Sequence, residues 1–100
     1  MKTTIQEQDG KLIAILEGRL DTSAAPETET AMSPLNDCEG KNIIIDCTNL
    51  EFISSAGLRI FLGLLNTAEE KGSHIYIKGL TDNVRAVFAM TGFIHLFEFM

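Results

Sequence analysis

A β-branched run that leads into a long amphipathic segment restricts the folds open to this chain. Residues 41–46 contain three consecutive isoleucines, which is typical of a strand buried on both faces. Residues 56–71 carry apolar side chains at helical spacing and stop at a glycine, as helices often do. The junction between them, residues 52–58, places serines where free backbone N–H groups and the helix dipole favour a phosphate. We therefore expect the junction to carry the function.

The rest of the chain alternates between predicted strands and helices. Residues 3–8 and 11–17 are expected to form two strands joined by a hairpin turn at Asp9-Gly10. The other elements are predicted at these positions: a helix at 22–35, a strand at 73–78, a helix at 81–90 and a short strand at 93–99. Such alternation favours right-handed crossovers and parallel strands, to which the hairpin adds an antiparallel pair. The predicted fold class is α/β: one domain over residues 1–100, with a mixed sheet of four to five strands packed against three or more helices.

The helix predicted at 22–35 has a clear start and an indistinct end. Thr22 or Ser23 is expected to cap its first turn through a side-chain oxygen. Pro26 fits the first turn, because the N–H that proline lacks has no helical partner there. Pro34 obscures the end of the helix, since proline interrupts helical hydrogen bonding.

Charge and hydropathy exclude several classes of partner. The net charge of −6 argues against nucleic acid or an anionic membrane as the main partner. No apolar stretch approaches the roughly 20 residues that span a bilayer, and the first residues lack the apolar core of a signal peptide. We therefore expect a cytoplasmic protein.

Catalytic and metal-binding chemistry is not predicted. Cys38 and Cys47 are spaced neither as a metal knuckle nor as a redox pair, and Cys47 is expected to be a small buried apolar residue. His74 and His95 are far apart in the sequence, and neither is placed as a base for Ser55. The chain also lacks a Gly-x-x-x-x-Gly-Lys phosphate loop. We therefore expect no enzyme activity, no metal ion and no cofactor.

The helix predicted at 56–71 has an apolar stripe and apolar residues outside it. At 100° per residue the stripe consists of Leu58, Phe61, Leu62, Leu65 and Ala68. Ile60 lies about 140° from the centre of this stripe, and Leu64 also fits it poorly. Two interpretations stay open. The two side chains either pack against the helix at 81–90 or stand singly exposed, or they form a protein-docking patch beside Ser55.

Four motifs follow one another along the chain. They are Gly18-Arg19-Leu20-Asp21, Ile45-Asp46-Cys47-Thr48, Phe52-Ile53-Ser54-Ser55-Ala56-Gly57-Leu58, and the segment from Val84 to Phe93. In this order and at this spacing they resemble the STAS domain and, within that family, the stand-alone bacterial anti-sigma factor antagonists. The resemblance spans nearly all 100 residues. It implies a small STAS-type fold that acts by binding other proteins.

The resemblance also implies a partner-switching cycle. In that family the dephosphorylated antagonist binds an anti-sigma factor, often itself a serine kinase that holds ATP, and so releases a sigma factor. The kinase then phosphorylates a serine at the start of the second helix, the complex separates, and a serine phosphatase resets the cycle. Carried over by motif, the acceptor is Ser55, with Ser54 as second choice, and the free protein is expected to be a monomer. The implied partner-binding residues are Asp21, Ser54, Ser55, Ala56, Gly57, Arg59 and Ile60.

Two positions depart from the family's pattern. Many phosphorylated members read Asp-Ser-Ser-Gly or Asp-Ser-Thr-Gly, whereas this chain has Ser54 for the aspartate and Ala56 for the second hydroxyl residue. An acidic neighbour of the acceptor is thereby lost. The alternative function is a STAS regulatory subunit of a transporter, lipid-trafficking or signalling complex that acts by binding without phosphorylation.

The site residues also have structural interpretations. Ser55 is expected to be the N-cap of its helix, a role compatible with phosphorylation. Gly57 is expected to let the backbone or a partner approach closely, or to relax the loop. Asp46 is expected to accept hydrogen bonds from N–H groups of a loop at 48–52. For Asp21, helix capping and partner contact both stay open.

Overall fold

In a computed structural model that describes residues 1–100, the chain begins with the predicted β-hairpin. Strands β1 (Lys2–Gln8) and β2 (Lys11–Leu20) are antiparallel and pair in register over the full length of β1. Between them Asp9 and Gly10 have φ angles of 53° and 76°. Two positive φ angles in a two-residue turn match the right-handed twist of the flanking strands. The prediction of a hairpin turn at these residues is confirmed.

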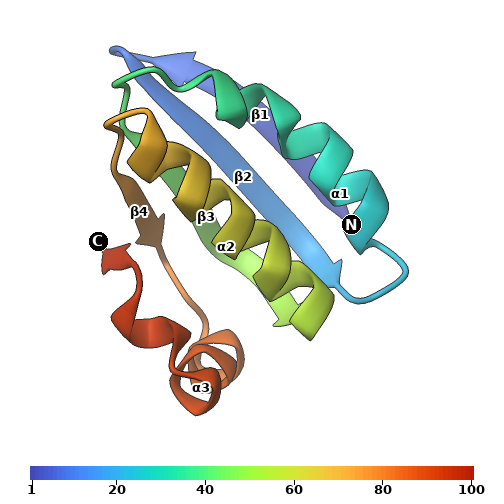
Figure 1. The fold of residues 1–100 in the computed structure, drawn as a ribbon. Helices are drawn as coiled ribbons and strands as arrows, with labels where there is room; N and C mark the ends of the chain where they lie inside the picture. Colours follow the sequence, from blue (N-terminus) through green and yellow to red (C-terminus); the bar gives the residue numbers. More distant parts are fainter.

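Five strands form one mixed sheet in the order β1-β2-β3-β4-β5 (Figure 1). β3 (Ile43–Ile53), β4 (Ile75–Lys78) and β5 (Glu98–Phe99) each run parallel to the preceding strand. The helical segments between the strands are α1 (Ala25–Met32), the 3₁₀ helix η1 (Ser33–Asp37), α2 (Ser55–Glu70), α3 (Asp82–Thr91) and the 3₁₀ helix η2 (Phe93–His95). The predicted α/β class and mixed sheet are confirmed.

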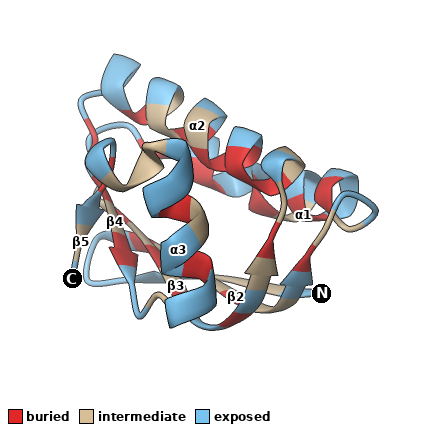
Figure 2. Cartoon of the chain, turned by 90° about the horizontal axis from the view of Figure 1, so that it is seen from below, coloured by how far each residue is buried: buried red, intermediate tan, exposed pale blue.

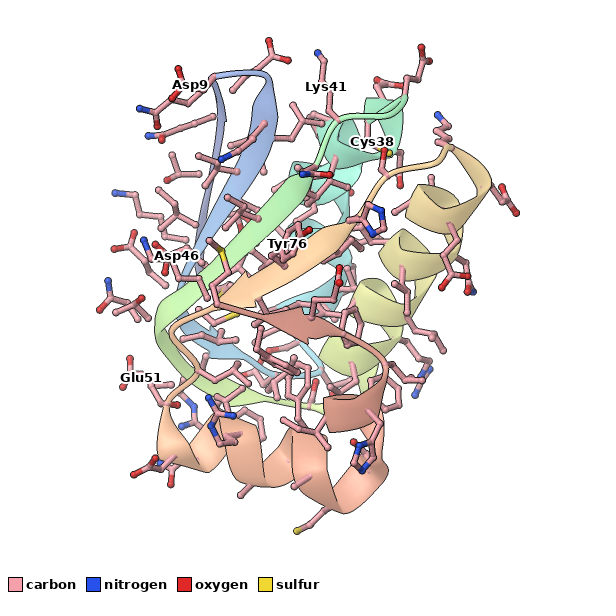
Figure 3. All side chains as sticks on the ribbon, turned by 90° about the vertical axis from the view of Figure 1, so that its left-hand side faces the viewer. Asp9, Cys38, Lys41, Asp46, Glu51 and Tyr76 are labelled. Carbon is pink, nitrogen blue, oxygen red and sulfur yellow. The ribbon has the colours of Figure 1, made fainter.

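Helices α1 and α2 lie side by side over one face of the sheet (Figures 1 and 2). The buried residues of both helices face the strands, so the core lies between the helix layer and the sheet (Figure 2). No helix covers the opposite face, on which Asp46 and Tyr76 lie (Figure 3). None of the helices is both long enough and apolar enough to cross a membrane.

An aromatic cluster joins α2, α3 and the end of the chain. The rings of Phe61, Phe88 and Phe97 meet edge to face, with centroids 5.9 to 6.3 Å apart. Phe61 and Phe88 are fully buried. Edge-to-face pairs of this kind add stability beyond the area that they bury. The cluster therefore holds α3, which crosses only one end of the sheet, against the core (Figure 1).

The prediction that β3 is buried on both faces is wrong. Ile43 and Ile45 are fully buried, but Ile44 between them is partly exposed on the face that no helix covers. β3 also continues through Ile53, so that residues 48–52, expected as a loop, belong to the strand. The parallel neighbours β2 and β4 supply the backbone hydrogen bonds, and a single helix layer suffices for a small domain of this kind.

The start and end of α1 also differ from the prediction. Its N-cap is Ala24, with no side-chain cap, so neither Thr22 nor Ser23 has the expected role. Pro26 lies in the first turn as predicted. The α-helix ends at Met32 and continues as the 3₁₀ helix η1, which contains Pro34.

The buried face of α2 is wider than the predicted stripe. Ile60 and Leu64, expected outside the stripe, are only 8% and 6% exposed, whereas Leu62 and Leu65 are partly exposed. The reason is that α2 packs against α1 as well as against the sheet. Ile60 lies in a groove with Glu29 of α1, so its helical neighbour is α1 and not the helix at 81–90.

Candidate functional site

The junction between β3 and α2 is fixed by three hydrogen bonds to Ser54. Its backbone N–H donates to the carbonyl of Leu20 at the end of β2, over 2.9 Å. Its side-chain Oγ accepts from the N–H of Gly57 at 3.2 Å, and its carbonyl accepts from the N–H of Leu58 at 2.9 Å. With φ −93° and ψ 172°, Ser54 has the extended conformation of an N-cap residue. Ser54, and not Ser55, therefore caps α2.

Ser55 is the first residue of α2 and takes no part in these side-chain contacts. It is exposed, and its hydroxyl has no hydrogen-bond partner in the protein. The expectation that Ser55 is the N-cap is wrong, because the extended residue that precedes the first helical turn is one position earlier. The two serines thus differ in chemistry: the Ser54 hydroxyl is engaged by the fold, and the Ser55 hydroxyl is open to a reagent from solvent.

Gly57 is required by packing inside the domain. It is buried, and a Cβ atom built on it would lie 2.8 Å from side-chain atoms of both Leu20 and Ile53. Such distances are well inside van der Waals contact, so any side chain would push the first turn of α2 away from the sheet. The close approach that was expected at Gly57 is real, but it is between α2 and the ends of β2 and β3.

A shallow groove between α1 and α2 begins beside Ser55. Its lining residues at this end are Ala25, Pro26, Glu29, Ala56, Arg59 and Ile60. Through Glu29 and Ile60 it continues along the two helices toward η1. The structure therefore brings together Ala56, Arg59 and Ile60 of the predicted site. Ile60 contributes as a floor residue, since it is almost fully buried.

Asp21 stands at the end of β2, one residue after Leu20, whose carbonyl contacts Ser54. Its Oδ1 accepts hydrogen bonds from the Ser23 hydroxyl at 2.8 Å and from the Ala24 N–H at 2.9 Å. These two bonds, in that order of importance, lower the pKa of the Asp21 carboxyl, and the charge of Arg19 adds to the effect. Asp21 is therefore ionised and orders the turn that leads into α1, but its side-chain hydrogen bonds end at Ala24, the N-cap residue, so it does not cap the first helical turn. It is partly exposed as well, so partner contact stays a prediction.

Several contacts near the site were not singled out from the sequence. The Arg19 guanidinium lies 4.5 Å from the centroid of the Phe52 ring, and the two residues are paired across β2 and β3. Both belong to the motifs quoted above, but their pairing depends on the irregular β2–β3 register. Glu29 of α1 was also missed, because the sequence does not show which helices are neighbours.

Asp46 and Cys47 make contacts within the fold. Asp46 Oδ1 accepts from the Thr48 N–H at 3.0 Å and from the Thr48 hydroxyl at 2.7 Å, which confirms the expected local hydrogen bond. Cys47 is fully buried as predicted, and burial raises the pKa of its thiol to about 12. A protonated, inaccessible thiol is not a nucleophile.

Neither histidine lies at the junction. The His74 ring is exposed and lies 3.5 Å from the Glu98 carboxylate, beyond the C-terminal end of α2. His95 is in η2, also exposed. The groups around Ser55 therefore form a surface with an exposed hydroxyl, the exposed Arg59 side chain and a groove of mixed polar and apolar lining.

Comparisons with known proteins agree with this fold. Residues 2–100 match the sequence profile of the STAS domain, so the chain belongs to the STAS domain family. BtrV, a candidate anti-sigma factor antagonist of Bordetella bronchiseptica, is 32% identical over 97 residues, which cover 97% of this chain and 84% of BtrV. The anti-sigma-B factor antagonist of Staphylococcus aureus is 29% identical over 75 residues, 75% of this chain and 69% of that protein.

The fold is also similar to solved structures of the Bacillus protein SpoIIAA, an anti-sigma factor antagonist. The unphosphorylated form aligns with a TM-score of 0.74 and 19% identity, covering 99% of this chain and 87% of SpoIIAA. The phosphorylated form aligns with a TM-score of 0.73 and 19% identity, covering 99% and 91%. At this identity the likeness establishes a shared fold.

The contacts of Gly57 predict an unusual response to alanine. Gly57→Ala should lower the free energy of unfolding by about 1–3 kcal/mol, because overpacking outweighs the higher helix propensity of alanine. Gly63→Ala is the matched control in the same helix, since no atom lies within 4 Å of a Cβ at that position. This control should raise stability by up to about 1 kcal/mol. Urea unfolding of both variants measures the difference, and equal effects at the two glycines would refute the packing account.

Because only Ser54 caps α2, substitutions at Ser54 and Ser55 should change the free energy of unfolding by different amounts. Ser54→Ala should lower the free energy of unfolding by about 0.5–2 kcal/mol through loss of the N-cap, and Ser54→Asn should restore most of it. Ser55→Ala should change stability by less than about 0.5 kcal/mol, as is usual for exposed residues. Thermal unfolding followed by circular dichroism tests both, and a larger loss at Ser55 than at Ser54 would contradict the observed cap.

Proposed function

We propose that this chain is an anti-sigma factor antagonist that docks on an anti-sigma factor with serine kinase activity and is released when that partner phosphorylates Ser55. The antagonist names of BtrV and of the Staphylococcus aureus protein support the class of function. The observation that carries the choice of residue is the exposed Ser55 hydroxyl beside a Ser54 hydroxyl that caps the helix. A kinase can reach the first without disturbing the fold.

The chemical step uses ATP held by the kinase. The Ser55 Oγ attacks the γ-phosphorus, a new P–O bond forms, and the bond between the γ-phosphorus and the β,γ-bridging oxygen breaks to release ADP. The hydroxyl proton passes to a base of the kinase, because no base of this chain is hydrogen-bonded to the Ser55 hydroxyl. In this step Ser55 is the acceptor, and this chain acts as a substrate rather than an enzyme. A serine phosphatase hydrolyses the phosphoserine and restores the hydroxyl.

Electrostatics explains why the modification releases the partner. A phosphoserine brings a charge of about −1.5 to −2 near neutral pH. In free antagonist it lies in water at the positive end of α2, where the helix dipole partly offsets the charge. In a docked complex the same dianion would lose its hydration, which costs more than the dipole returns unless the partner supplies arginines. Phosphorylation therefore weakens docking while the fold stays intact.

The docking surface consists of the junction and the adjoining groove. Ser55 and Arg59 are exposed on it, and Ala56 and Ile60 give it an apolar floor. Asp21 flanks it at the end of β2, and Ser54 fixes its backbone. Gly57 contributes indirectly, by letting α2 sit close to the sheet. We further propose that this domain works in the cytoplasm, where a sigma factor acts.

Site mapping on the kinase reaction tests this function. The partner is obtained by pull-down from native cell extract, with and without phosphatase treatment, and is then incubated with ATP and each variant. Mass spectrometry is expected to place one phosphate on Ser55 in the wild type and in Ser54→Asn, which lacks the Ser54 hydroxyl but keeps a capping side chain. Ser55→Ala should take up none.

Two results would count against the proposal. Phosphate on Ser54 in the wild type would show that Ser54, and not Ser55, is the acceptor. A stable complex that never becomes phosphorylated in the presence of ATP would favour a STAS subunit that acts by binding alone. The sequence gives a reason to test for the second outcome, because Ser54 replaces the aspartate that precedes the acceptor in many phosphorylated members.

A further inference from the structure

One cation stands near the acceptor hydroxyl without an ion-pair partner. Arg59 is the only basic residue in α2 and is exposed. Its guanidinium forms no ion pair within 4.0 Å in the structure, and it makes no side-chain hydrogen bond and no contact with an aromatic ring. Glu29 of α1 lines the same groove as Arg59 but is not paired with it. The Arg59 guanidinium is therefore free to bind an anionic group.

Helix geometry directs Arg59 toward Ser55. The two residues are four apart in α2, which places their Cβ atoms about 5–6 Å from each other on one face. Side chains on a helix lean toward its N-terminus, so a long residue covers the turn before its own Cα. An arginine at position 59 can therefore reach back to the first turn of α2, where Ser55 begins the helix. An acidic group placed N-terminal to a basic one at this spacing is also the more favourable order.

We propose that the phosphate on Ser55 is bound by the guanidinium of Arg59 in the same chain, and that this contact withdraws Arg59 from the docking surface. Guanidinium and phosphate form paired charge-assisted hydrogen bonds, and Arg59 has no competing partner to give up. The inference rests on the phosphorylation of Ser55 proposed above. Phosphorylation then changes the surface twice: it adds a dianion, and it removes the one cation that α2 offers to an acidic group of the partner.

The test uses purified protein that carries phosphoserine at position 55, introduced during synthesis, so that neither kinase nor partner is needed. The second pKa of the phosphate is measured by ³¹P NMR titration. Arg59 stabilises the dianion and so lowers this pKa. Arg59→Gln is therefore expected to raise it by about 0.2–0.4, and Arg59→Lys, which keeps the charge without the planar fork, by less.

Lys71→Gln is the matched control. It removes the same charge from the C-cap residue that follows α2, about 24 Å from Ser55 along the helix axis at 1.5 Å per residue, and should leave the phosphate pKa unchanged. A second readout is the Nε–H resonance of Arg59, which should shift with the same midpoint as the phosphate. An identical phosphate pKa in the wild type and Arg59→Gln, with an Arg59 resonance that does not titrate, would overturn the inference. That outcome would leave phosphorylation of Ser55 itself unaffected, because the kinase experiment tests it separately.

Discussion

The close approach of α2 to the ends of β2 and β3 determines the form of the functional surface. At Gly57 the helix backbone lies so near Leu20 and Ile53 that no side chain fits. The hydrogen bond from the Ser54 N–H to the Leu20 carbonyl fixes the same contact from the other side of the junction. Because the strand end and the helix start are locked together, the direction of each side chain in the first turn is set by the core. The exposed groups at this corner are therefore held in place by contacts inside the domain.

In this arrangement the hydroxyl proposed for phosphorylation is not the hydroxyl that caps α2. The Ser54 hydroxyl, on the extended N-cap residue, accepts from the Gly57 N–H, whereas Ser55, the first helical residue, is exposed to solvent. A phosphate on Ser55 adds charge where the helix dipole is positive, and it breaks no hydrogen bond of the folded chain. Stability and partner affinity can thus change independently. The groove beside it has a mixed lining, with the charged Arg59 and Glu29 next to the almost fully buried Ile60.

Local patterns in the sequence predicted local structure well, and contacts between distant elements less well. The Asp9-Gly10 turn and the α/β order follow from backbone preferences of a few residues, and both are confirmed. The burial of Ile60 depends on α1, which lies elsewhere in the sequence, so a helical wheel of α2 alone placed it wrongly. Ile44 was misjudged for the same reason, because the sequence does not say that helices cover only one face of the sheet. At the junction between β3 and α2, residue type alone favoured Ser55 as the N-cap, and only the coordinates show that Ser54 caps the helix.

Calorimetric titration of the anti-sigma factor with two forms of this protein tests the central claim most directly. One form is unmodified, and the other carries phosphoserine at position 55, with the melting temperature of each measured alongside. We expect the phosphorylated form to bind at least tenfold more weakly, which corresponds to about 1.4 kcal/mol, and to melt within about 4 °C of the unmodified form. Equal affinities would contradict the account. A large fall in melting temperature would also contradict it, because the phosphate would then act by disturbing the fold.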